Sequence, residues 1–172
     1  MTAPRHALVL SFDTFGDILL RQPMLTALLD RGVRVTLAVR EAFAGLAAFL
    51  DPRLEVHPTG LDPYVPGGPD WTAQVDALAA ALRARGADCL VAAPFNRTRV
   101  DDAIVGAFTD ARRVGLRART GVADDLLSDA AIVDESAPEL EKARARPAPP
   151  RPRGAPPRPP AAAAGAGRLA RP

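Results

Sequence analysis

Two carboxylates, Asp13 and Asp17, stand four residues apart in the stretch LSFDTFGDILLRQP, which covers residues 10–23. An aspartate acts as a general base when it lies within hydrogen-bond reach of a substrate hydroxyl, and this is the functional interpretation of Asp17. Gly16 directly before it would let a substrate approach the backbone closely. The structural alternative is that Asp17 stabilises a helix N-terminus and that Asp13 forms an Asx turn. From these residues alone, both interpretations stay open.

The elements that must position this stretch alternate between strands and helices. Apolar and β-branched runs predict strands at residues 6–12, 33–40, 53–58, 88–93 and 112–116. Apolar spacings of three and four predict helices at 18–29, 41–50 and 71–85, with a loop and a further helix within 94–108. The fold class is therefore α/β, an open, mostly parallel, Rossmann-like sheet with helices on both faces, in which residues 6–12 form the central strand.

Helix boundaries are indicated by a few individual residues. Pro23 lacks an N–H, so the first helix either begins near Gln22 or runs from Asp17 with a kink at the proline. Gly32 and Gly86 follow the last apolar positions of two helices and predict their C-terminal stops. Asp70 is expected to cap the helix that begins near Trp71.

Ligands of open parallel sheets bind at the carboxyl ends of the strands. Asp13, Thr14 and Asp17 follow the first predicted strand. A second polar group follows the strand that ends near Ala93, and it consists of Asn96, Arg97 and Arg99. Because a guanidinium pairs well with phosphate or carboxylate, this second loop is expected to contribute to binding an acceptor substrate.

Several common sites are missing from the sequence. No G-x-G-x-x-G, G-x-x-x-x-G-K-[ST] or G-x-S-x-G motif is present, which disfavours a generic flavodoxin-like nucleotide-binding domain and a serine hydrolase. His6 and His57 lack partners at metal-ligand spacing, so no metal is expected. The single cysteine, Cys89, lies in the apolar run CLVAA and is expected to be a buried small hydrophobe.

The formal net charge of +2 conceals a division between body and tail. Residues 1–141 contain 14 arginines against 20 acidic residues, whereas Lys142 and seven arginines follow Glu141 with no further acid. The acidic body disfavours nucleic acid as a partner. The start of the chain shows no secretory signal and no run long enough to span a membrane, so a cytoplasmic location is expected.

The chain is expected to comprise a Rossmann-like domain at 1–143 and a disordered tail at 144–172. The tail is rich in Pro, Arg and Ala and offers no periodic apolar face. Helix-like patterning stops abruptly before it, and its composition is that of GC-rich DNA read out of frame. A frameshifted or truncated end is therefore a hypothesis, which the coding DNA beyond codon 142 would test.

The stretch FDTFGDILLRQPMLTALLDRGVRVTLAVREAFAGL resembles the amino-terminal half of glycosyltransferase family 9, the ADP-heptose:lipopolysaccharide heptosyltransferases. The family pattern is an apolar strand, a basic residue, two small hydroxyl residues, an apolar residue, Gly-Asp, and a helix with a proline six residues after that aspartate. Gly16, Asp17 and Pro23 match it. The resemblance extends over residues 5–143, where Arg40, Phe43, RARGADCLV and RRVGL also fit the family. Two positions depart from the pattern. Ser11 stands in place of the basic residue, and Asp13 and Thr14 stand in place of the two small hydroxyl residues.

The resemblance implies the acceptor half of a two-domain glycosyltransferase-B architecture. Asp17 would then be the catalytic base for inverting transfer of a heptose-like sugar from a nucleotide-diphosphate sugar to a glycan or lipopolysaccharide-core acceptor. Asp13, Thr14, Gly16, Asn96, Arg97 and Arg99 would contact the acceptor, without a cofactor or metal. The negative charge of Asp13 is unexpected beside an anionic acceptor.

Two further expectations concern what this chain does by itself. Family members carry a second, donor-binding domain where this sequence has its tail, so the chain is expected to be an inactive fragment, in peripheral contact with the inner membrane surface at most. A different class of function is a stand-alone binding module whose basic tail recruits an anionic membrane or protein partner.

Overall fold

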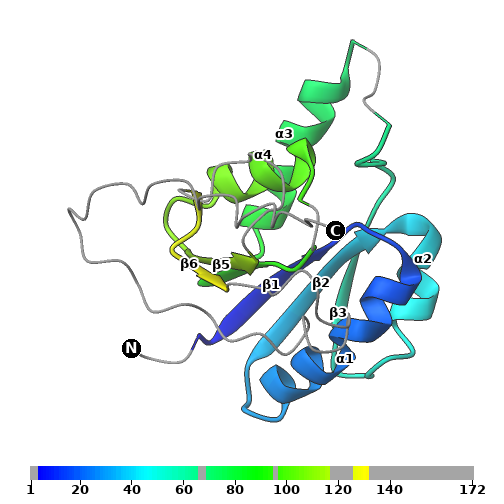
Figure 1. Cartoon of the computed structure of the whole chain (residues 1–172), viewed down its shortest axis with the longest axis vertical. Helices are drawn as coiled ribbons and strands as arrows, with labels where there is room; N and C mark the ends of the chain where they lie inside the picture. The colour runs from blue at the N-terminus through cyan, green and yellow to red at the C-terminus, as the bar shows by residue number, and fades with distance from the viewer. Residues whose placement is uncertain (1–3, 66–68, 95–96, 117–125, 132–172) are drawn as a thin grey trace, which may run out of the picture.

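A computed structural model describes residues 4–65, 69–94, 97–116 and 126–131, and they form one parallel sheet covered by helices (Figure 1). The strands are β1 (His6–Ser11), β2 (Arg34–Arg40), β3 (Glu55–Thr59), β4 (Cys89–Ala92), β5 (Arg112–Leu116) and β6 (Asp129–Ala131). The helices are α1 (Phe15–Leu29), α2 (Glu41–Ala47), α3 (Trp71–Arg83) and α4 (Arg99–Ala107).

The strand order is β3-β2-β1-β4-β5-β6, and every neighbouring pair is parallel. All six residues of β1 are buried, as expected for a strand with neighbours on both sides and helices on both faces. The first strand of the chain is thus central in the sheet. Because β2 follows on one side of β1 and β4 joins on the other, the strand order reverses direction at this point.

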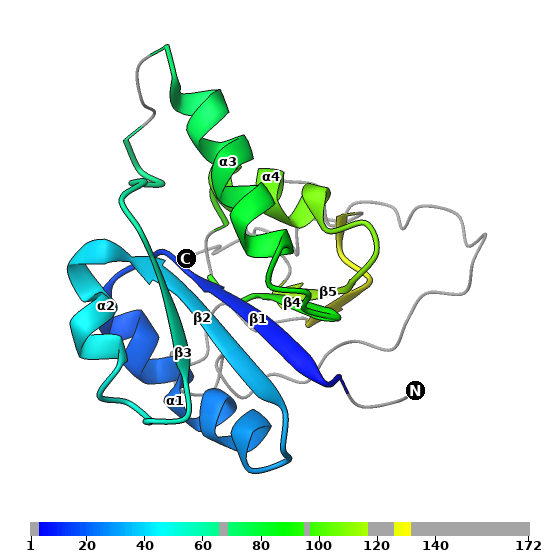
Figure 2. The ribbon, with the colours of Figure 1, turned by 180° about the vertical axis from the view of Figure 1, so that it is seen from behind.

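The helices divide between the two faces of the sheet, as Figures 1 and 2 show from opposite sides. Residues of α1 and α2, including Ile18, Leu25 and Ala47, pack with Val9 and Leu37 in one buried cluster. The opposite cluster joins α3 and α4 to the alternate side chains of the strands, and it contains Leu8, Leu10, Phe12, Leu82, Leu90 and Ile104. The predicted Rossmann-like fold with two covered faces is confirmed.

The first helix settles the question raised by Pro23. It begins at Phe15 and continues through the proline to Leu29, so it starts two residues before Asp17. Gly32 and Gly86 have φ angles of 75° and 68°, in the left-handed region that glycine enters without steric cost. These two glycines end the turns after α1 and α3, as the sequence predicted.

Two local expectations were wrong or incomplete. Asp70 occupies the N-cap position of α3, but its side chain makes no capping hydrogen bond there. The short strand β6 was not predicted, because three residues are too few to show a periodic pattern. The predicted disordered tail at 144–172 lies outside the described residues. In the described part of the chain, no helix combines the length and apolar character needed to cross a membrane.

The carboxyl ends of the parallel strands meet at one side of the sheet, which we call the carboxyl edge. The loops after β1, β2, β3 and β4 all leave from it, since parallel strands share one direction. In sheets of this kind, ligands bind beside the point where the strand order reverses, here between β1 and β4. The residues that follow these two strands are therefore the candidates for function.

Candidate functional site

Asp17 lies in the first turn of α1, directly after the central strand. One of its carboxylate oxygens, Oδ2, accepts hydrogen bonds from the backbone N–H of Thr14 at 3.1 Å and from the Thr14 hydroxyl at 2.6 Å. The side chain is half-buried, and within the described part of the chain its other oxygen, Oδ1, has no hydrogen-bond partner. Asp17 therefore stabilises the helix N-terminus through one oxygen, and this arrangement leaves the general-base interpretation open.

Gly16 is exposed beside Asp17, and the fold does not require a glycine there. A Cβ atom added at this position would meet only the Thr14 hydroxyl oxygen, at an ordinary contact distance of 3.7 Å. Its φ angle is not positive either. A role for this glycine thus has to be sought in what approaches the helix from outside.

Asp13 is buried and forms an ion pair with Arg21, which projects from α1. Arg21 Nη1 donates to Asp13 Oδ1 at 2.8 Å, and Nη2 donates to Oδ2 in a second, shorter contact. The same guanidinium donates to the Ser11 hydroxyl at 2.7 Å and to the Ala93 carbonyl oxygen at 3.1 Å. Arg21 therefore joins the end of β1, the first helix and the residue after β4.

Arg21 brings a positive charge from the first helix to two residues that the sequence analysis singled out. It donates to the Ser11 hydroxyl and pairs with Asp13, so the buried carboxylate has a counter-charge. Sequence reasoning missed Arg21, although a signal existed: it lies on the buried face of α1, in register with Ile18, Leu25 and Leu29.

A second carboxylate, Asp101, lies in the first turn of the helix after β4, as Asp17 lies in the first turn of the helix after β1. Asp101 in the first turn of α4 accepts hydrogen bonds from the Thr98 N–H at 2.7 Å and the Thr98 hydroxyl at 2.8 Å, the arrangement seen for Thr14 and Asp17. Asp101 differs in being 1% exposed. Burial, followed by repulsion from Asp13 and Asp102, raises the pKa of Asp101 to about 6 against the lowering effect of the Thr98 hydrogen bonds.

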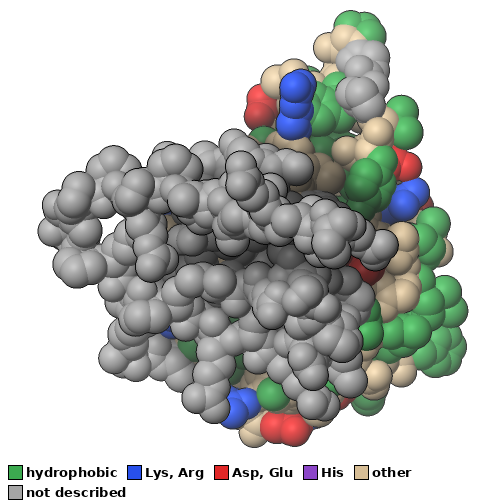
Figure 3. All heavy atoms as spheres, viewed as in Figure 1, with side chains coloured by type: hydrophobic (Ala, Val, Ile, Leu, Met, Phe, Trp, Pro, Cys, Tyr) green, Lys and Arg blue, Asp and Glu red, His purple; other side chains and the backbone are tan. Residues whose placement is uncertain are grey.

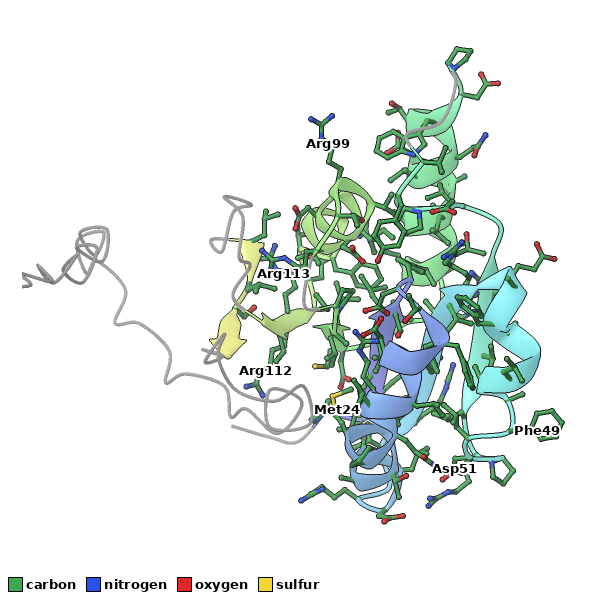
Figure 4. All side chains as sticks on the ribbon, turned by 45° about the vertical axis from the view of Figure 1, so that its right-hand side comes forward. Met24, Phe49, Asp51, Arg99, Arg112 and Arg113 are labelled. Carbon is green, nitrogen blue, oxygen red and sulfur yellow. The ribbon has the colours of Figure 1, made fainter. Side chains whose placement is uncertain are left out.

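The residues after β4 that were predicted to contact an acceptor differ in their surroundings. Arg97 is buried and forms an ion pair with Asp102, with Nε 3.2 Å from Oδ1. Arg99 is exposed at the start of α4 and projects outward, away from the sheet (Figure 4). Asn96 lies outside the described residues. In the described part of the chain, the structure brings together Asp13, Thr14, Gly16 and Asp17 at one site, and it leaves Arg99 apart.

The raised pKa of Asp101 predicts a specific pH dependence of stability. Between about pH 4 and pH 6 the folded protein binds this proton and the unfolded chain releases it, so the free energy of unfolding falls as the pH rises. A shift of about two pKa units changes the free energy of unfolding by at most about 3 kcal/mol over this pH range. Asp101→Asn keeps an oxygen for the Thr98 N–H and has no charge to bury.

We therefore expect Asp101→Asn to gain stability relative to the parent protein as the pH rises from about 4 to about 7. Urea unfolding at several pH values measures the difference. Asp76→Asn, a change at an exposed carboxylate of α3, controls for the loss of one charge. Parallel stability curves for Asp101→Asn and the parent would contradict the prediction.

Comparison with known proteins places this fold in a class. No family model and no curated protein sequence matches the chain. Solved structures do match: Escherichia coli heptosyltransferase WaaC with ADP aligns with a TM-score of 0.64 at 20% identity, over 81% of this chain and 45% of that one. The structure of the same enzyme with ADP-2-deoxy-2-fluoro heptose aligns with a TM-score of 0.62 at 20% identity, over 81% of this chain and 46% of that one.

A third structure belongs to the same class. The glycosyl transferase family 9 protein from Veillonella parvula aligns with a TM-score of 0.61 at 13% identity, over 81% of this chain and 39% of its own. The domain therefore has the Rossmann-like fold of glycosyltransferase-B enzymes. More particularly, it resembles heptosyltransferases and family 9 proteins in fold, and it spans less than half of their length.

Proposed function

We propose that this domain is the acceptor-binding half of a family 9-type glycosyltransferase and that Asp17 is its catalytic base. The observation that carries the proposal is the place of Asp17 in the fold: a half-buried carboxylate at the start of the helix that follows the central strand, held through one oxygen by Thr14. A domain with the fold of the heptosyltransferases thus presents a proton acceptor at the edge where ligands of such sheets bind.

The reaction we propose is an inverting sugar transfer. Asp17 takes the proton of an acceptor hydroxyl, and that oxygen forms a bond to the anomeric carbon of the donor. The bond from the anomeric carbon to the diphosphate breaks, and the nucleotide diphosphate leaves with the electron pair. Attack opposite the leaving group inverts the configuration at the anomeric carbon.

The donor we propose is a nucleotide-diphosphate sugar of the heptose type, since two matching structures hold ADP or an ADP-heptose analogue. The acceptor we propose is a glycan such as the lipopolysaccharide core, made at the cytoplasmic side of the inner membrane. Transfer needs a donor-binding domain to position the two substrates, and positioning supplies much of the rate of such reactions. The 172-residue chain alone is accordingly expected to bind an acceptor without transferring sugar to it.

Binding to this chain tests the proposal without a donor domain. We expect deacylated lipopolysaccharide core oligosaccharide to shift the amide NMR signals of Thr14 and Asp17, and ADP to leave them unchanged. Gly16→Ala should keep the fold, because its Cβ meets no clash, and should weaken oligosaccharide binding about tenfold by blocking close approach.

Gly45→Ala on α2 is the matched control, because it is the same change in a helix with no atom within 4 Å of the new Cβ. It should bind the oligosaccharide as the parent protein does. Binding of ADP at these residues in place of the oligosaccharide would contradict the acceptor assignment and favour a nucleotide-binding module.

A further inference from the structure

Tyr64 lies in the loop between β3 and α3, and this loop is fixed at the carboxyl edge. The Tyr64 backbone N–H donates to Asp62 Oδ1 at 2.9 Å, and Asp62 Oδ2 accepts from Arg40 Nη2 at 2.9 Å. Arg40 is the last residue of β2, next to the central strand. On the other side of Asp62, Leu61 is buried in the same cluster as Phe12, which follows β1. Both contacts hold the loop over the ends of the central strands.

A series of contacts between Arg40 and two phenylalanine rings connects the end of β2 to the start of α1. The Arg40 guanidinium carbon lies 5.4 Å from the centre of the Phe43 ring, and the Phe43 ring lies 6.3 Å from that of Phe15. Phe15 is the first residue of α1, two positions before Asp17. These contacts link the loop that holds Tyr64 to the first residue of the helix that carries Asp17.

The electrostatic surroundings of Tyr64 agree with this placement. Its pKa is raised, first by partial burial and then by the negative charges of Asp13, Asp101 and Asp17, while Arg40 acts in the opposite direction. These carboxylates belong to the loop after β1 and to the first turns of α1 and α4. The side chain is 54% exposed, so a ligand at the carboxyl edge can reach both its ring and its hydroxyl group.

We propose that Tyr64 is a second acceptor-contact residue, which binds a sugar ring against its aromatic face while its hydroxyl group hydrogen-bonds a neighbouring sugar hydroxyl. Tyrosine suits this role because it joins a flat apolar surface to one polar group, as a sugar ring joins C–H faces to hydroxyls. This inference rests on the proposed function, and it defines the acceptor near Asp17 as a pyranose with one accessible C–H face. Sequence reasoning had no signal for it, since Tyr64 is 47 residues from Asp17 in a Pro/Gly-rich loop.

Affinity measurements with two variants test the proposal. Isothermal titration with deacylated lipopolysaccharide core oligosaccharide should show about tenfold weaker binding for Tyr64→Ala, which loses ring and hydroxyl. Tyr64→Phe keeps the ring and loses only the hydroxyl group, so its affinity for the oligosaccharide should fall about threefold. Phe49→Ala is the control, because Phe49 is an aromatic residue of 89% exposure in the turn after α2, and its side chain projects away from the ribbon (Figure 4). Hydrophobic side chains gather on the surface at this side of the molecule, over α2 (Figure 3).

A second measurement needs no ligand, because Tyr64 is the only tyrosine of the chain. Its ionisation can be followed by ultraviolet absorbance, and Asp17→Asn should lower the pKa of the phenol by removing one of the nearby charges. An unchanged phenol pKa in Asp17→Asn would overturn the placement of Tyr64.

Different results would exclude the role of Tyr64 and the proposed function. If the oligosaccharide binds the parent protein and Tyr64→Ala equally well, Tyr64 is not an acceptor contact, and the proposed function stands. If the oligosaccharide does not bind the parent protein, the proposed function fails together with this inference. A loss in Phe49→Ala equal to that in Tyr64→Ala would also overturn the assignment, because the effect would then not be specific to the site.

Discussion

Replacing Arg21 by methionine is expected to lower the free energy of unfolding by about 3–5 kcal/mol, because it leaves the Asp13 carboxylate buried without its partner. The side chains of Arg21 and Asp13 are 5% and 9% exposed, so water cannot replace the lost hydrogen bonds. The Ser11 hydroxyl and the Ala93 carbonyl oxygen lose their donor as well. Urea unfolding with a linear extrapolation gives the number.

The double variant Asp13→Asn/Arg21→Met separates pairing from packing. Since it removes both charges, it should be less destabilised than the sum of the two single variants, with a coupling free energy of about 1–3 kcal/mol. Arg53→Met provides the control: the Arg53 side chain is 49% exposed and pairs with Asp30 and Asp51 near the surface, so its loss should cost clearly less stability than the loss of Arg21. Equal losses for Arg21→Met and Arg53→Met would show that the buried pair does not hold the three elements together.

The second large effect concerns catalysis. In a polypeptide that joins this domain to a donor-binding domain, Asp17→Asn should lower kcat by about a hundredfold to ten-thousandfold, since an amide cannot accept the proton of the acceptor hydroxyl. The amide oxygen can still accept the Thr14 N–H, so the fold should lose no more than about 1 kcal/mol. Steady-state kinetics with parallel unfolding measurements give both quantities.

Thr14→Val distinguishes the loss of the Asp17 carboxylate from the loss of its orientation. It removes the hydroxyl that contacts Asp17 Oδ2 at 2.6 Å and leaves the carboxylate in place. A base that is merely less well oriented should retain more activity than one that is absent, so Thr14→Val is expected to be the milder variant. Full activity of Asp17→Asn would remove Asp17 from the mechanism, whatever the result for Thr14→Val.

The pairing of Asp13 with Arg21 changes the electrostatic picture of the site. Arg21 offsets the negative charge of Asp13, although Asp13 still contributes to the raised pKa of Asp101. Among the described residues, three arginines at the carboxyl edge are paired with carboxylates, Arg21 with Asp13, Arg40 with Asp62 and Arg97 with Asp102, whereas Arg99 is exposed at the start of α4. Recognition of a sugar by ring and hydroxyl contacts, as proposed for Tyr64, uses none of the three paired arginines.

Much of the fold could be predicted because its determinants are local. The buried run at residues 6–12 and the periodic spacing of apolar residues in α1 and α3 fix the type of each element within a few residues along the chain. Parallel strands linked by helices then leave few arrangements of the sheet. The position of Asp17 at the carboxyl edge follows from the same pattern, since it comes directly after the first strand.

What the sequence by itself determined is thus the α/β class, the central place of the first strand and the edge at which the candidate residues gather. The tertiary structure alone decided what each polar side chain does there. It buried Arg97 against Asp102, paired Asp13 with Arg21 and held the Tyr64 loop at the end of β2 through the pairing of Asp62 with Arg40. The physical reason is that charge pairing and burial depend on how the elements pack in three dimensions, even where the paired residues are only five or eight positions apart, and spacing along the chain does not specify that packing.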